Sequence, residues 1–213
     1  MAEIRAVVLA AGSSSRLGRP KQLLELGGEP LLNHVLRTAG MSRVDGTILV
    51  LGHATEPIAG QVGDFGQITV TNPDYASGQS SSLRAGVAAL PATTGAALIL
   101  LGDQPLVTAA LIDRMVETWQ ATGRTDAIIQ ARYGDIPAPP VVIGRDLFAQ
   151  IERLEGDTGA RDLIRANRDR VIAVATGEPE PFDVDTDEDY QRLRRQWSSR
   201  QVESSGGSDG RRE

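Results

Sequence analysis

Short apolar runs recur along the chain and alternate with stretches whose apolar residues are spaced three and four apart. The runs are IRAVVLA, GTILVL, QITVT, AALILL, DAIIQA, PPVVI and RVIAVA, and the intervening stretches include PLLNHVLRTAG, SSLRAGVAAL, TAALIDRMVETWQ and GRDLFAQIERL. The runs predict β-strands and the spaced patterns predict amphipathic helices. Strands that alternate with helices predict an α/β fold, a Rossmann-like three-layer α/β/α arrangement with a mostly parallel sheet. AALILL is apolar on both faces, which predicts a central strand.

One domain is expected to contain nearly all of the chain. Its 213 residues suit a single core that buries about 70% of the surface exposed by the unfolded chain. The last stretch, SSRQVESSGGSDGRRE, is rich in serine, glycine and charge and lacks the apolar side chains that a core requires. We therefore expect one domain over residues 1–197 and a disordered polar tail over residues 198–213.

Composition excludes several classes of function. The chain has no cysteine, which rules out disulfides, thiolate metal sites and a cysteine nucleophile. Its net charge of −6 argues against non-specific binding to nucleic acid. No apolar run is long enough to span a membrane, and the opening MAEIRAVVLAAG shows no secretory signal. We expect a cytoplasmic protein without nucleic-acid or membrane partners, in which an anionic substrate needs local cations or a metal.

The loop that follows the first predicted strand is a candidate phosphate site. In open α/β sheets, ligands bind outside the carboxyl ends of the strands. The segment LAAGSSSRLGRPK offers small residues that let backbone N–H groups approach a phosphate, serine hydroxyls, and two cations, Arg16 and Lys21. Its spacing matches neither a P-loop nor a G-x-G-x-x-G motif. A flexible Gly/Ser turn is the ordinary alternative, but the two cations favour a cradle for a polyphosphate.

Lys21 is unusual within this chain. It is the single lysine among 22 basic residues, the other 21 being arginine. Lysine presents a compact point charge, whereas arginine is a broad planar fork, so the two are not interchangeable where space is tight. We expect Lys21 to lie between crowded phosphate oxygens.

A carboxylate at the end of the central strand is a candidate metal ligand. In LILLGDQP, Asp103 follows the strand directly, and divalent metals are commonly held by one or two carboxylates together with substrate phosphates. The alternative is that Asp103 caps the next helix, but Thr108 is the better cap for TAALIDRM.

A second acidic stretch, PFDVDTDEDYQRL, follows much later in the chain. Thr186 or Asp187 is expected to cap the last helix, and acids in a first helical turn favour its positive dipole end. Asp183 and Asp185 precede the cap, and alternation places both on one side of an extended segment. Either could complete a metal site with Asp103, although such a cluster alone is more often structural.

The stretch TNPDYASGQSSSLRAG follows another predicted strand. Gly78 and the adjacent serines could hydrogen-bond the edge of a nucleobase. The alternative is a helix start capped by serine at residues 80–82, and both can hold together. His34 and His53 form no ligand pair, and we assign no role to either.

Five motifs, taken in order, resemble a known family. LAAGSSSRLGRPKQ, NPDYASGQSSSLRAG, LLGDQP, LEGDTGARDLI and DVDTDEDY are similar in sequence and spacing to the molybdenum cofactor nucleotidyltransferases (MobA-like NTP transferases), particularly the cytidylyltransferases. The resemblance covers about residues 4–195. It implies a nucleotide-diphospho-sugar transferase type of fold, a Mg²⁺ cofactor, and transfer of a nucleotidyl group from an NTP to the terminal phosphate of molybdopterin with release of pyrophosphate. A molybdoenzyme or its chaperone is the implied recipient of the product.

The resemblance also implies functional residues. It assigns catalysis to Arg16, Lys21 and Asp103, and the metal to Asp103 and Asp185, with Asp183 as a weaker choice. The nucleotide-binding residues that it implies are Leu9, Ala10, Ala11, Gly12, Ser13, Ser14, Arg16, Lys21, Gly78, Ser81, Ser82 and Asp103.

The chain departs from the family pattern at one point, which bears on the acceptor. Many relatives have Gly-His-Pro before the strand that shapes the acceptor side, whereas this chain has Ala138, Pro139 and Pro140. The start of the phosphate loop, Ala-Ala-Gly, is similar to that of cytidylyltransferases and favours CTP over GTP. The rival interpretations are the same chemistry on another phosphorylated acceptor, such as a sugar phosphate, or a non-catalytic nucleotide-binding or chaperone-like subunit.

Overall fold

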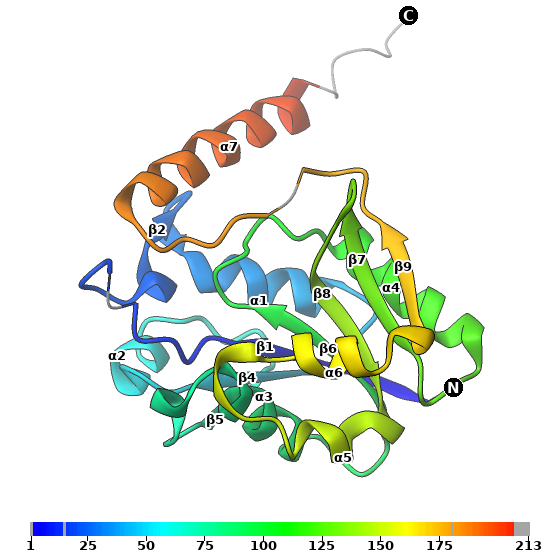
Figure 1. Cartoon of the computed structure of the whole chain (residues 1–213). Coiled ribbons are helices and arrows are strands. Elements are labelled where there is room, and N and C mark those ends of the chain that lie inside the picture. The colour runs from blue at the N-terminus through cyan, green and yellow to red at the C-terminus, as the bar shows by residue number, and fades with distance from the viewer. Residues whose placement is uncertain (1, 15, 180, 207–213) are drawn as a thin grey trace, which may run out of the picture.

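The computed structural model describes residues 2–14, 16–179 and 181–206, and this part of the chain forms a three-layer α/β/α domain (Figure 1). Its main sheet has seven strands in the order β5 (Ile68–Thr71), β4 (Thr47–Leu51), β1 (Glu3–Leu9), β6 (Thr94–Leu101), β8 (Ile136–Gly144), β7 (Ile128–Tyr133) and β9 (Val171–Ala175). A short hairpin pairs β2 (Glu25–Leu26) with β3 (Glu29–Pro30). The α/β fold class is confirmed.

Seven α-helices and five short 3-10 helices complete the described elements. The α-helices are α1 (Leu31–Met41), α2 (Thr55–Ala59), α3 (Gln79–Ala88), α4 (Ala109–Thr122), α5 (Phe148–Ile151), α6 (Arg161–Ala166) and α7 (Asp187–Gly206). The 3-10 helices are η1 (Lys21–Leu23), η2 (Tyr75–Ser77), η3 (Arg145–Leu147), η4 (Gly156–Thr158) and η5 (Arg168–Arg170). No helix among the described residues is both long enough and apolar enough to cross a membrane.

The sheet is mostly parallel, and its central strand is β6, as the AALILL run predicts. β6 is the fourth of the seven strands and is buried along almost its whole length. The antiparallel pairs both involve β8, which runs against β6 on one side and β7 on the other. Because β1 and β6 are parallel neighbours, Leu9 pairs with Leu101, and the loops after the two strands emerge side by side.

Helices cover both faces of the sheet. One apolar core joins the sheet to α1 and α4 through Leu32, Val35, Ile112 and Met115. The other joins it to α3, α5 and α6, with Leu83, Ile151 and Leu163 as central members. Thr108 caps α4 by accepting a hydrogen bond from the Leu111 amide, as the sequence predicts.

The last helix differs from the prediction of a disordered tail from Ser198. α7 continues to Gly206, and Arg200 binds it to the domain by donating to the Leu106 carbonyl at 2.9 Å and pairing with Glu178 at 2.7 Å. The first part of α7 packs through Leu193 and Trp197 against an apolar cluster that includes Leu24, Leu26 and Leu31, and Arg200 holds the helix beyond this cluster through polar contacts. Residues 207–213 of the predicted tail lie outside the described residues. Figure 1 shows α7 lying beside β2, away from the main sheet.

Candidate functional site

A cavity of about 520 Å³ opens at the carboxyl ends of β1 and β6. Three segments build it: the loop after β1, the loop after β6, and the start of α3 with the nearby η4 turn. This is the edge of the sheet at which ligands bind in open α/β folds. The predicted site residues that line it are Leu9, Ala10, Ala11, Gly12, Ser13, Lys21, Gly78, Ser82 and Asp103.

Lys21 is the cation that pairs with the acidic side chains at this cavity. Its Nζ is 2.5 Å from Oδ2 of Asp103 and 3.1 Å from Oδ1 of Asp185, so one ammonium bridges two carboxylates. The Lys21 side chain is only 17% exposed and that of Asp103 only 11%. Burial lowers the pKa of Lys21, but the two carboxylates outweigh this effect and the pKa is raised overall. The lysine is therefore a cation at neutral pH.

The phosphate loop is held in shape by two polar side chains. Gln22 is buried, and its Nε2 donates to the Ala10 carbonyl at 2.7 Å. The Ser14 hydroxyl accepts from the Lys21 amide at 3.1 Å. These bonds join the start of the loop to its end, so they fix the position of the backbone that would surround a phosphate. Gln22 was not among the predicted residues, because its role depends on a contact twelve residues away.

The start of α3 is packed tightly against the turn at residues 156–158. Gly78 has φ of +109°, and a Cβ there would lie 2.4 Å from the carbonyl carbon of Gly156, so only glycine fits. Asp157 accepts a hydrogen bond from the Gln79 amide at 3.2 Å. Both Asp157 and Gln79 line the cavity.

The serines of this segment have different roles. α3 begins at Gln79, and its flanking residue, Gly78, makes no side-chain capping bond, so the serines lie within the first turn rather than capping it. Ser81 is buried, and its hydroxyl is held by Asn72 at 2.8 Å and by the Gly78 carbonyl at 2.8 Å. Ser82 faces the cavity.

The two predicted metal ligands, Asp103 and Asp185, lie near each other in the structure. Asp103 and Asp185 share Lys21, and Asp185 also pairs with Arg16 at 3.1 Å. Carboxylate oxygens are the ligands that hard cations such as Mg²⁺ and Mn²⁺ prefer. Among the described residues no group of three or more histidine, aspartate, glutamate or cysteine side chains is placed to hold a metal. A metal here would depend on two carboxylates with substrate phosphates and water.

The cavity includes some of the predicted residues and not others. Ser14, Arg16, Ser81 and Asp185 are not among the described residues that line it. Arg16 is an exposed side chain that pairs with Asp185 outside the cavity lining. Asp183, the weaker metal choice, does line it. Tyr75, Gln79 and Asp157 also line the cavity and are not among the predicted residues. The LEGDTG motif includes Asp157, but Asp157 lies 78 residues from its partner Gln79, so local spacing could not predict this contact.

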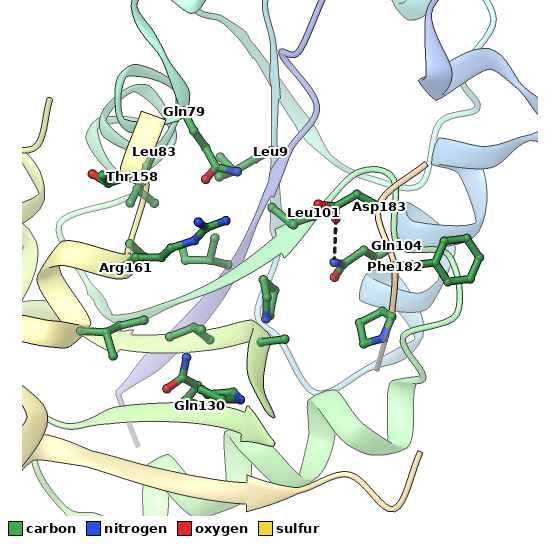
Figure 2. A pocket seen from close by; sticks show the side chains of 18 of the residues that line it. Leu9, Gln79, Leu83, Leu101, Gln104, Gln130, Thr158, Arg161, Phe182 and Asp183 are labelled. Atoms are coloured by element: carbon green, nitrogen blue, oxygen red, sulfur yellow. Dashed lines mark hydrogen bonds between the residues drawn. The ribbon is translucent and has the colours of Figure 1, made fainter. Parts of the chain in front are cut away.

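A larger cavity of about 920 Å³ adjoins the first one. The two cavities share Leu9, Gln79, Leu101 and Asp183, so they form one continuous cleft. Figure 2 shows the larger cavity with Gln104 and Asp183 on one side, where Gln104 Nε2 donates to Asp183 Oδ1 at 3.4 Å. Burial, followed by the nearby charge of Asp103, raises the pKa of Asp183. Ala138 and Pro139, at the position where the chain departs from the family pattern, also line this cavity.

The three-layer α/β/α fold places two adjoining cavities at the carboxyl ends of the parallel strands β1 and β6. Residues 6–171 match the MobA-like NTP transferase domain. The chain belongs to this family.

Individual relatives differ in how much of their length this chain covers. This chain is 32% identical over 133 residues to the bifunctional protein GlmU of Kineococcus radiotolerans, and the matched region covers 61% of this chain and 27% of that protein. The chain thus spans about a quarter of this GlmU. It is 31% identical to the nicotine blue oxidoreductase of Paenarthrobacter nicotinovorans, covering 89% of this chain and 96% of that protein.

The fold is also similar to a solved structure over nearly its full length. The crystal structure of Rv0371c from Mycobacterium tuberculosis is 34% identical, with a TM-score of 0.82, and covers 91% of this chain and 98% of that one. A complex of Rv0371c with manganese is similar at 32% identity and a TM-score of 0.77, with 91% and 98% covered.

Proposed function

We propose that this nucleotidyltransferase transfers CMP from CTP to the terminal phosphate of molybdopterin, with Mg²⁺ as its cofactor and pyrophosphate as the second product. The observation that carries the proposal is the Lys21–Asp103 pair, which lines the smaller cavity and joins the two loops that follow β1 and β6. A buried cation beside a carboxylate is suited to a triphosphate and its metal, because the cation can pair with the phosphates and the carboxylate can bind the metal.

The reaction needs positioning more than it needs proton transfer. An oxygen of the acceptor phosphate forms a bond to the α-phosphorus of the NTP as the bond from the α-phosphorus to its β-bridging oxygen breaks. The electron pair leaves with pyrophosphate. The acceptor phosphate is already anionic at neutral pH, so no general base is required. Lys21 would hold the triphosphate in line and offset the charge that builds on the leaving group.

Asp103 and Asp185 are the residues that would hold the metal. Their oxygen chemistry fits Mg²⁺, and the shared ammonium of Lys21 shows that both carboxylates can face one cation. Bound there, the metal would supply charge neutralisation on the phosphates. The manganese complex of Rv0371c supports a divalent metal in this type of fold.

The division of the cleft supports two substrates. The smaller cavity is lined by the predicted phosphate loop and the start of α3, which supports this cavity as the nucleotide site. The larger cavity adjoins it at Asp183 and Leu101 and would receive the acceptor. The Ala10-Ala11-Gly12 start of the loop favours a pyrimidine.

Pyrophosphate release tests the proposal. The protein is incubated with Mg²⁺, each of the four NTPs in turn, and molybdopterin, either bare or metal-loaded. We expect pyrophosphate to appear only when acceptor and metal are present, and fastest with CTP. Release with a sugar phosphate but not with molybdopterin would favour the rival acceptor, and no release with any NTP would favour a non-catalytic binding subunit.

A second candidate is an oxidoreductase, favoured by the nearly full-length similarity to nicotine blue oxidoreductase. The charged groups around Lys21 are suited to binding phosphates, and they do not themselves favour hydride transfer. The same preparation should therefore be tested for oxidation of NADH and NADPH by an added two-electron acceptor, such as a quinone-like dye. Turnover there without pyrophosphate release would decide for this second function.

A further inference from the structure

Arginine side chains gather on the wall of the larger cavity. Arg161, Arg165, Arg168 and Arg192 all line it, although the chain as a whole carries a net charge of −6. Among the described lining residues the one carboxylate is Asp183, which lies at the junction with the smaller cavity. The larger cavity is therefore a positively charged compartment within an acidic protein.

Two of these arginines are already engaged. Arg165 pairs with Asp162 at 3.0 Å, and the guanidinium of Arg192 lies 4.3 Å from the ring centroid of Phe182. Arg161 and Arg168 have no ion-pair partner within the described part of the chain. Figure 2 shows the guanidinium of Arg161 extending into the cavity from α6.

The surroundings strengthen any charge interaction at this wall. Leu83, Ile99 and Val141 form an apolar floor beside the arginines. Arg161 and Arg168 are exposed to solvent, and a ligand that fills the cavity would displace water from them, so that charge-assisted bonds would gain strength as the local dielectric falls. A guanidinium also offers a planar pair of donors that fits phosphate, carboxylate or an oxyanion of a metal.

The arginine wall is separate from the place where the reaction would occur. Lys21 and Asp103 line only the smaller cavity, whereas Arg161 and Arg168 line only the larger one. The acceptor phosphate that reacts with the α-phosphorus would lie beside Lys21. It is therefore a different group from the one that Arg161 and Arg168 could bind.

We propose that Arg161 and Arg168 bind a second anionic group of the acceptor, so that the acceptor carries at least two such groups, one that reacts near Asp103 and one held at α6 and η5. This inference rests on the proposed nucleotidyl transfer and specifies its acceptor: a phosphate ester with an apolar or heterocyclic body and a further anionic group. Arg161 and Arg168 are then specificity-determining residues, which accept the doubly anionic substrate and disfavour a simple monophosphate.

Binding of two matched probes tests the proposal without turnover. The full chain is first saturated with Mg²⁺ and α,β-methylene-CTP to fill the smaller cavity, and this binding is measured by calorimetry. Adenosine 3′,5′-bisphosphate and adenosine 5′-monophosphate are then titrated separately; they share one heterocyclic body and differ by one phosphate. We expect the bisphosphate to bind about tenfold more tightly, as two charge-assisted contacts allow.

Two double variants identify the residues responsible. Arg161→Gln with Arg168→Gln removes the two free charges from the wall and should abolish the preference for the bisphosphate. Arg153→Gln with Arg195→Gln removes the same charge from exposed positions outside the cavity and should keep the preference. A wild-type chain that binds both probes equally or binds neither, or a preference that persists in the first variant, would overturn the inference. Failure of the initial nucleotide binding would instead contradict the proposed function.

Discussion

The ammonium of Lys21 and the carboxylate of Asp103 face each other at 2.5 Å across the loops that follow β1 and β6. In the proposed complex both groups would have other partners, the lysine a phosphate and the aspartate a metal. The pair therefore competes with metal binding for as long as the nucleotide is absent, and this competition can be measured.

Removing the lysine should strengthen the binding of metal alone. In Lys21→Met, Asp103 and Asp185 lose the ammonium that they share, so Mn²⁺ should bind without nucleotide about tenfold more tightly than in wild type, since ion-pair partners within about 4 Å compete directly. Electron paramagnetic resonance of free Mn²⁺ measures this. Equal or weaker binding in Lys21→Met would show that the lysine does not occupy the metal position.

Lys21→Arg should keep the charge but lose turnover. The side chain lies in a narrow, mostly buried position between two carboxylates, and a guanidinium there would move the triphosphate from its in-line position. We expect kcat to fall roughly a hundredfold, the scale of a misplacement near 1 Å, with nucleotide affinity largely kept. Lys21→Ala should weaken nucleotide binding as well. A Lys21→Arg enzyme within about threefold of wild-type kcat would show that charge alone is sufficient.

Asp103→Asn should abolish metal-dependent turnover in a folded protein. A neutral amide cannot supply the charge that a hard cation needs from its ligand. Asp135→Asn, in an exposed turn where Asp135 pairs with Arg132, is the matched control and should have normal activity. The measurement is pyrophosphate release, with circular dichroism as the check on folding. Near-normal release by Asp103→Asn would remove Asp103 from the site.

The enzyme should prefer CTP to GTP. The Ala10-Ala11-Gly12 start of the loop, which lines the smaller cavity, resembles that of cytidylyltransferases, and a hundredfold ratio needs only about 2.7 kcal/mol of differential binding. The comparison is kcat/KM for the two nucleotides at one Mg²⁺ concentration. Equal values, or a preference for GTP, would contradict the interpretation of the Ala-Ala-Gly sequence.

The pairing of Glu29 with Arg37 should make stability depend on pH. Hydrogen bonds from Arg37, at 2.5 Å to each carboxylate oxygen, and the charge of His34 lower the pKa of Glu29. The carboxylate therefore stabilises the fold above its unfolded pKa, and this contribution is lost as pH falls through its lower folded pKa. Glu29→Gln should cost up to about 1 kcal/mol at pH 7, because the pair is partly exposed.

Urea unfolding of wild type and Glu29→Gln at pH 7 and at pH 3 measures this contribution. The difference between the two proteins should shrink at the lower pH. A difference that is the same at both values would mean that the Glu29 carboxylate does not act through its charge.

Local patterns in the sequence were enough to predict the layers of the fold and the loops of the site. The apolar run of β6 predicts its central place in the sheet, and the polar residues after β1 and β6 lie at one cavity because parallel neighbours end at the same edge. The hydroxyl of Thr108 caps α4 because it is placed one residue before the first apolar turn.

What local patterns could not predict were contacts made across long stretches of chain. The extent of α7 depends on Arg200 reaching Leu106 and Glu178, and composition alone indicated a tail. The positions of Asp157 against α3 and of Arg161 at the larger cavity follow from the packing of the segment between β8 and β9. Nothing in the spacing of these residues relates them to the phosphate loop.

The most direct measurement of the central claim follows the label from two forms of CTP. The protein is incubated with Mg²⁺, molybdopterin and CTP carrying ³²P at either the α- or the γ-phosphate, and the products are separated by chromatography. Nucleotidyl transfer predicts that the α-label appears in a molybdopterin–cytosine dinucleotide and the γ-label in pyrophosphate. In Asp103→Asn neither labelled product should form, and both labels should stay in CTP. An acceptor that carries the γ-label, or an α-label found only in free CMP, would contradict the account.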